Sequence, residues 1–199
     1  MIISHKYKYV CINPPKTGTG FRENLLKNHS DINSKFPEYK KLHCRHWNTS
    51  LASKFLKSLK MNPDEYFWFT IVRDPVERIV SWVNMIQNRN IRDKKPFVDA
   101  NTLGYEIIKS QTWRFNDYIY RDGRLVDFIG SIENISADTK HVISKLQIDI
   151  NIFSHKDTYI HNYKSVIREE LDTELIDLIC ETEKEVIEMK GYNCTSHDR

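Results

Sequence analysis

The sequence predicts an α/β protein: a single three-layer domain over residues 1–199, with a mainly parallel central sheet and helices on both faces. Short β-rich apolar runs alternate with segments whose apolar residues recur every three or four positions, which favours strands alternating with helices. No repeat, low-complexity tract or Gly/Pro/Ser-rich linker divides the chain. Its 199 residues suffice for one domain with a sizeable core and are few for two.

The first part of the chain supplies two strands and two helices. Their expected order is strand 7–12, helix 21–27, helix 50–60 and strand 66–72. The first strand ends at Asn13-Pro14-Pro15, a stop signal. The helix at 50–60 places Leu51, Phe55 and Leu59 four positions apart, on one face. The run 66–72 (YFWFTIV) is continuously apolar, as in a strand buried on both faces of a parallel sheet.

The second part begins with a helix whose N-terminus is marked by local sequence signals. Asp74 can cap the first N–H groups, Pro75 suits the first helical position, and Glu77 completes a pattern like a capping box. Residues 125–132 form a third strand candidate. From about residue 172, apolar residues at helical spacing predict one long helix that ends at Gly191, a natural C-cap.

Composition excludes several classes of protein. A hydrophobic fraction of 40% and a charged fraction of 29% suit a soluble globular protein. The net charge of +3 fits an anionic ligand but is too small for a nucleic-acid-binding protein. The N-terminal residues lack a signal-peptide pattern and no window approaches a membrane span, so we expect a cytoplasmic protein or an excised catalytic domain.

The four cysteines are scattered, without a CxxC pair. Their spacing indicates neither a zinc site nor a disulfide framework, although one pair could be bridged.

The segment from Pro15 to Phe21 (PKTGTGF) joins a predicted strand to a predicted helix. Such a junction presents unpaired backbone N–H groups and the positive end of a helix dipole, which hold phosphate-like anions. Gly18 and Gly20 allow close approach of the backbone, Lys16 adds a positive charge, and Thr17 and Thr19 add hydroxyl donors. An ordinary strand–helix turn is the alternative. The loop is not a Walker A motif, because its lysine precedes the glycines.

A second signal follows the second apolar strand, in the string from Arg73 to Ser81 (RDPVERIVS). Arg73 falls at the carboxyl end of a strand, where open α/β sheets hold their ligands. Ser81 lies about two turns into the following helix. A guanidinium suits bidentate contact with a phosphate, and the serine hydroxyl adds a donor. The alternative is a surface turn that opens a capped helix.

Together these two strings resemble the motifs of sulfotransferases that use 3′-phosphoadenosine 5′-phosphosulfate (PAPS). Residues 15–19 match the 5′-phosphosulfate loop P-K-[TS]-G-T-T, and the Arg73 string matches the 3′-phosphate motif R-[DN]-P-x-x-R-x-x-S. The resemblance implies a P-loop NTPase-like sulfotransferase fold. It also implies that Lys16, Thr17, Gly18, Thr19, Gly20 and Phe21 bind the 5′ side of PAPS, with Arg73 and Ser81 on the 3′-phosphate. Arg78 is expected to be structural.

Weaker matches extend the resemblance to carbohydrate-type members over nearly the full chain. They are Arg45-His46 before a helix, the run Tyr66 to Phe69, the segment Phe128 to Asn134 and the ending Lys190-Gly191-Tyr192. The chain departs from the family in Gly20, where Thr is common, in Phe21, where Ser is frequent, and in Ser131, which replaces an arginine.

Sulfuryl transfer to a hydroxyl requires a base, for which histidine is suited near neutral pH. The resemblance places His46 at the position of an active-site histidine, with His43 as the reserve. Lys16 is expected to stabilise charge on the transferring and leaving groups. We expect no metal, because no acidic pair or His/Cys cluster has ligand spacing. The predicted acceptor is a hydroxyl of a glycan or small molecule.

Two other functions remain open at this point. One is a nucleotide-dependent phosphotransferase or ATPase of related architecture, since a fold does not fix the chemistry. The other is a non-catalytic module that binds anions or glycans.

Overall fold

The computed structural model describes residues 1–110, 113–150 and 166–194. Within them the chain packs into two compact units, each built from segments far apart in the sequence. Unit 1 comprises residues 1–72 and 115–150, and unit 2 comprises residues 73–110, 113–114 and 166–194. This division does not test whether the chain folds as a single domain, so the one-domain expectation stays a prediction.

Unit 1 contains a five-stranded sheet with the order β3-β1-β2-β4-β7. Its strands are β1 (Ile2–Ser4), β2 (Tyr9–Ile12), β3 (Ile32–Asn33), β4 (Phe67–Val72) and β7 (Phe128–Ser131). Strand β4 pairs in parallel with both β2 and β7, whereas β1 pairs antiparallel with β2 and β3. The predicted strands therefore form the parallel part of a mixed sheet, and the short antiparallel strands β1 and β3 were not predicted.

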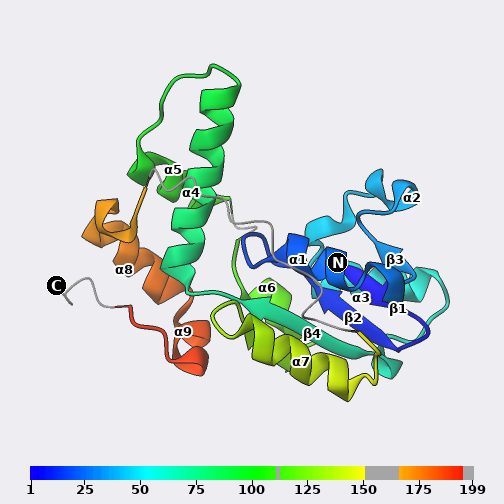
Figure 1. The fold of residues 1–199 in the computed structure, drawn as a ribbon. Helices are drawn as coiled ribbons and strands as arrows, with labels where there is room; N and C mark the ends of the chain where they lie inside the picture. Colours follow the sequence, from blue (N-terminus) through cyan, green and yellow to red (C-terminus); the bar gives the residue numbers. More distant parts are fainter. Residues whose placement is uncertain (111–112, 151–165, 195–199) are drawn as a thin grey trace. The chain divides into compact units, whose positions relative to one another are not determined.

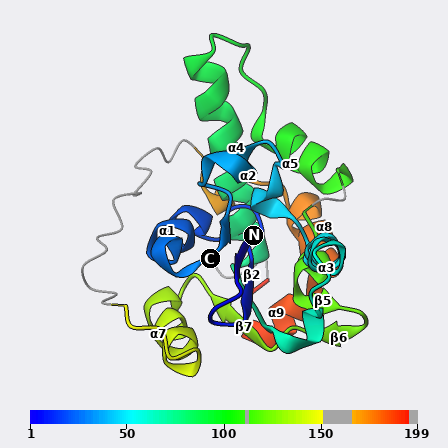
Figure 2. The same cartoon turned by 90° about the vertical axis from the view of Figure 1, so that its right-hand side faces the viewer.

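Helices cover both faces of this sheet, as predicted. Alternate side chains of β2 enter different cores: Tyr9 and Cys11 one, Val10 and Ile12 the other. The first core is completed by α1 (Thr19–Leu25) and α7 (Ile135–Lys145), and the second by α3 (Thr49–Ser58) and α6 (Asn116–Ile119). Figure 1 shows α7 along the sheet, and Figure 2 shows α1 and α7 on one side of it and α3 on the other.

The remaining elements of unit 1 are short. They are the helix α2 (Pro37–Lys40), the hairpin β5 (Tyr120–Arg121) and β6 (Arg124–Leu125), and the 3-10 turns η1 (Lys27–His29), η2 (Cys44–His46) and η3 (Pro63–Glu65). Leu125 thus belongs to a separate hairpin, and the third strand begins only at Phe128 instead of at residue 125. The side chain of Asp127 accepts from the Trp68 backbone N–H at 2.6 Å just before β7 starts.

Unit 2 is helical. It contains α4 (Pro75–Arg92), α5 (Ala100–Lys109), the 3-10 turn η5 (Arg168–Glu170), α8 (Thr173–Thr182) and α9 (Lys184–Lys190). Its core is formed by apolar residues of α4, α5 and α8 around the buried Trp113. Gly104 allows α5 to approach α8, because a Cβ there would lie 2.5 Å from Leu175 Cδ2.

The predicted helix from residue 172 to Gly191 is two helices in the structure. The Thr182 hydroxyl donates to the Leu178 carbonyl at 2.7 Å, a bond that bends helices, and α8 ends at Thr182. The end of the second helix agrees with the prediction, since Gly191 adopts a left-handed φ of 67° after α9.

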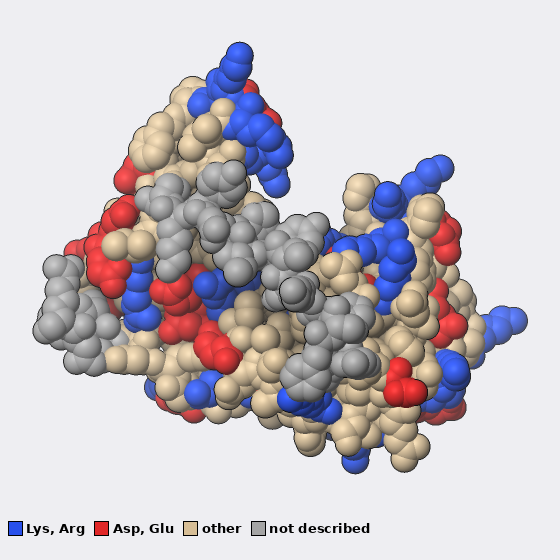
Figure 3. Space-filling view, viewed as in Figure 1, with Lys and Arg blue, Asp and Glu red and all other residues tan. Residues whose placement is uncertain are grey.

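A disulfide joins Cys180 to Cys194, whose Cα atoms are 5.9 Å apart, while Cys11 and Cys44 are buried thiols. One pair is therefore bridged, an outcome that the sequence had left open. Within the described ranges, no helix has the length and apolar character needed to cross a membrane. Figure 3 shows both basic and acidic side chains on one face of the molecule.

Candidate functional site

The loop after β2 lies at the edge of the sheet where the parallel strands end. β2, β4 and β7 point the same way, so their carboxyl ends share that edge. Gly18 adopts a left-handed conformation (φ 73°), and a Cβ there would lie 3.3 Å from Ile135 Cδ1 and 3.5 Å from Ile132 Cδ1. Both the backbone angle and the close packing thus favour glycine. The residues that follow β7 therefore pack against the predicted anion-binding loop.

The threonine hydroxyls of the loop donate hydrogen bonds to a backbone carbonyl at the start of the loop. Thr17 Oγ1 donates to the Pro14 carbonyl at 2.9 Å and Thr19 Oγ1 to the same carbonyl at 3.3 Å, and both residues are buried. Lys16, by contrast, is half-buried and has a left-handed φ of 65°. Such a backbone is costly for a residue with a side chain, and strain of this kind is concentrated at functional sites. Gly20 and Phe21 are also half-buried.

A buried arginine, Arg22, donates hydrogen bonds to the loop, and the sequence analysis did not predict it. Arg22 is 2% exposed, and its guanidinium donates to Asn13 Oδ1 (Nε, 3.0 Å), to Thr17 Oγ1 (Nη2, 3.0 Å) and to the Thr17 carbonyl. These three acceptors are neutral, and no salt bridge of Arg22 occurs among the described residues. A desolvated positive charge therefore lies next to the loop, with the buried carboxylate of Glu23 as the acid that acts on it, and this charge favours an anion bound to the loop. Since α1 has only seven residues, charge contributes more here than a helix dipole.

His46 contacts the same loop through the turn η2. Its Nδ1 lies 2.8 Å from the Asn13 carbonyl oxygen. A carbonyl only accepts, so Nδ1 carries the hydrogen and Nε2 keeps a lone pair. His46 retains exposed surface, yet neighbouring residues desolvate the ring, and this desolvation lowers its pKa to about 4 against the opposing effect of the Asn13 bond. With its pKa lowered, the imidazole is neutral near pH 7 and can accept a proton at Nε2.

His43 is placed differently. It is exposed and adopts a left-handed φ of 49° just before η2. In the part of the chain that the structure describes, its side chain has no hydrogen-bond partner. The structure thus brings His46, and not His43, to the loop that begins at Asn13.

In unit 2, the Arg73 string opens α4 as predicted. The Asp74 side chain accepts from the Glu77 backbone N–H at 2.9 Å, and Pro75 is the first helical residue. Arg73 is partly buried, with Nη2 3.6 Å from Glu77 Oε2. Ser81 is half-buried and lies six residues beyond Pro75, about 9 Å along the helix axis.

Arg78, on the same helix, is fully buried, with its guanidinium 6.0 Å from the centre of the Trp82 ring. Its role stays a prediction.

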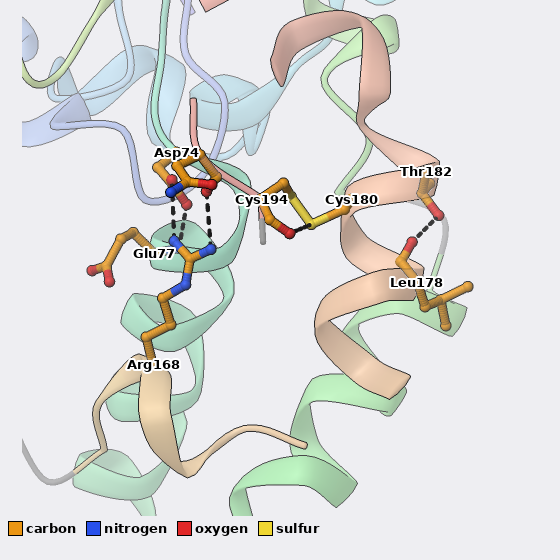
Figure 4. The surroundings of a disulfide bond; sticks show 8 residues. Asp74, Glu77, Arg168, Leu178, Cys180, Thr182 and Cys194 are labelled. Carbon is orange, nitrogen blue, oxygen red and sulfur yellow. Dashed lines mark hydrogen bonds and ion pairs between the residues drawn. A yellow bond between two sulfur atoms is a disulfide. The ribbon is translucent and has the colours of Figure 1, made fainter. Parts of the chain in front are cut away.

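Asp74 has a further partner that the local sequence does not mark. Arg168 Nη1 lies 3.5 Å from Asp74 Oδ2, and Arg168 Nη2 donates to the Asn193 carbonyl at 2.9 Å. Asn193 precedes Cys194, which the disulfide joins to α8 (Figure 4). The C-terminal segment of unit 2 is therefore connected through Arg168 to the residue that caps α4.

The chemistry available in unit 1 is limited but specific. Lys16 belongs to the loop, the buried Arg22 of α1 donates hydrogen bonds to it, and the neutral imidazole of His46 contacts Asn13 at its start. Together these residues are suited to hold an anion and to take up a proton. No group of three or more potential metal ligands occurs among residues 1–110, 113–150 and 166–194.

The family model described as the sulfotransferase family matches residues 1–185, a range that includes both candidate phosphate-binding segments and His46. No curated protein and no solved structure matches the chain. The P-loop-like form of the fold accordingly stays a prediction.

Proposed function

Because the chain belongs to the sulfotransferase family, we propose that it is an enzyme that transfers a sulfuryl group from PAPS to a hydroxyl of a carbohydrate or small-molecule acceptor. Membership of this family is what supports sulfuryl transfer as the reaction. The donor, the acceptor and the residue roles below are parts of the proposal.

The donor would be held at its two anionic ends. In this proposal the loop Lys16–Phe21 binds the 5′-phosphosulfate, and Arg73 and Ser81 bind the 3′-phosphate. The buried guanidinium of Arg22 supports the first assignment, because its hydrogen-bond partners are neutral and an anion on the loop would complement its charge. For the second, Arg73 offers a planar guanidinium suited to a phosphate, held 3.6 Å from Glu77 on the first turn of α4.

The residue proposed as the base is His46. The observation that carries this role is the 2.8 Å contact between its Nδ1 and the Asn13 carbonyl, which ties the ring to the loop and leaves Nε2 as the acceptor of a proton. Nε2 takes the proton of the acceptor hydroxyl as the new O–S bond forms. The bond from sulfur to the 5′-phosphate oxygen breaks, and adenosine 3′,5′-bisphosphate leaves. Lys16 stabilises the negative charge on the departing phosphate.

Thermal-shift titration tests the proposal against its alternatives. A ligand that binds only the folded protein raises its stability by mass action. We expect adenosine 3′,5′-bisphosphate to raise the melting temperature and ATP with Mg²⁺ to leave it unchanged. The reverse result would support a phosphotransferase and overturn the proposal, and no response to either ligand would favour a binding module without turnover.

A further inference from the structure

Arg45 lies beside Gly20, the position at which this loop departs from the family pattern. Its Nη2 is 3.9 Å from the place that a Cβ of residue 20 would take. Arg45 belongs to η2, directly before His46 in the chain. The short turn η2 thus brings two side chains to the segment that follows β2. The imidazole of His46 contacts Asn13, directly after the strand, and the guanidinium of Arg45 lies beside Gly20.

A buried carboxylate fixes the guanidinium in this place. Glu23, in α1, has a side chain that is 1% exposed, and its Oε2 lies 2.9 Å from Arg45 Nη2. Its Oε1 accepts from the Ser34 hydroxyl. Arg45 keeps 51% of its side-chain surface exposed, and in the described part of the chain Glu23 is the one residue that accepts a hydrogen bond from its guanidinium. Since a guanidinium has five N–H donors, most of them remain available for a ligand.

We propose that Arg45 binds the 5′-phosphate that the loop holds, in place of the hydroxyl that Gly20 lacks, and that Glu23 positions it. The inference rests on the proposed function. Glycine at position 20 supplies no hydroxyl, and Arg45 Nη2 lies in ordinary contact distance, 3.9 Å, of the place where a side chain there would begin. The loss of a neutral hydroxyl donor is then offset by charge-assisted hydrogen bonds, which are the stronger kind.

A purely structural role for Arg45 predicts a different behaviour. Its charge would then serve only to neutralise the buried carboxylate of Glu23. Removing both charges together would leave ligand affinity unchanged. The two roles are therefore separated by measuring ligand affinity in variants that stay folded.

The test is isothermal titration calorimetry with adenosine 3′,5′-bisphosphate, which carries the 5′-phosphate. For Arg45→Gln we expect the Kd to rise by at least about tenfold, as is typical of a lost hydrogen bond to a charged group. Arg124→Gln is the matched control: it removes the same charge from unit 1 at a side chain that is 74% exposed, and should leave the Kd unchanged within about twofold. Adding Gly20→Thr to Arg45→Gln should recover part of the loss.

Arg45→Gln leaves the carboxylate of Glu23 buried without its partner, which destabilises the fold. The double variant Glu23→Gln/Arg45→Gln avoids this, because it removes both charges. An unchanged Kd in this folded double variant would overturn the inference and leave the proposed function intact. A wild-type protein that does not bind adenosine 3′,5′-bisphosphate would instead overturn the proposed function.

Discussion

Replacing the buried Arg22 with methionine should lower the melting temperature by about 6–12 °C. Methionine is unbranched and fills the space of the arginine stem, but it donates no hydrogen bond. The change removes the Arg22 hydrogen bonds to the Thr17 carbonyl, to Thr17 Oγ1 and to Asn13 Oδ1, of which Asn13 Oδ1 keeps the Cys11 thiol as a donor. Each such loss costs about 1–3 kcal/mol, so we expect roughly 3 kcal/mol in total. For a chain of this size, each kcal/mol corresponds to about 2–4 °C.

Differential scanning calorimetry measures this effect directly. Arg124→Met is the control, because Arg124 is 74% exposed and its nearest acid, Asp64, lies 3.9 Å away. A surface change of this kind alters stability by about 0.5 kcal/mol at most, or roughly 2 °C. A melting temperature for Arg22→Met that equals the control would refute the conclusion that this guanidinium holds the loop.

Three further predictions concern the base and the disulfide. His46→Ala should abolish sulfuryl transfer and leave the affinity for adenosine 3′,5′-bisphosphate nearly intact; near-normal turnover would remove His46 from the mechanism. Because desolvation lowers the pKa of His46 to about 4 and the base must be neutral, kcat/KM should stay constant down to about pH 5 and fall only below it; an acid limb at or above about 6.5 would contradict this assignment. Reducing the bond between Cys180 and Cys194, 14 positions apart, should cost about 3 kcal/mol. A melting curve that dithiothreitol does not change would be evidence against the bond.

The sequence predicted the elements whose signals are local. The run Phe67–Val72 reads as a buried strand because every residue is apolar or β-branched, and Asp74, Pro75 and Gly191 mark helix ends through their own backbone and side-chain chemistry. Strand β1 was missed because it has only three residues and lies between β2 and β3 in the sheet, and its partner β3 is distant in the sequence.

In the candidate site, too, residues marked by local sequence signals were predicted, whereas residues placed by contacts between distant segments were not. Lys16, Gly18 and Arg73 could be named as candidates because they belong to contiguous strings. Arg22 was not, since a charged residue in a short helix indicates a solvated side chain, and its burial depends on the packing of α1 against the sheet. The pairing of Glu23 with Arg45 joins positions 22 residues apart and leaves no local pattern.

The most direct test of the central claim is a transfer assay with two labelled donors, [³⁵S]PAPS and [γ-³²P]ATP, against a panel of glycan and small hydroxylated acceptors. We predict that wild-type protein moves ³⁵S to at least one acceptor, with release of adenosine 3′,5′-bisphosphate, and that His46→Ala does not. Transfer of ³²P from ATP without any transfer of ³⁵S would contradict the account.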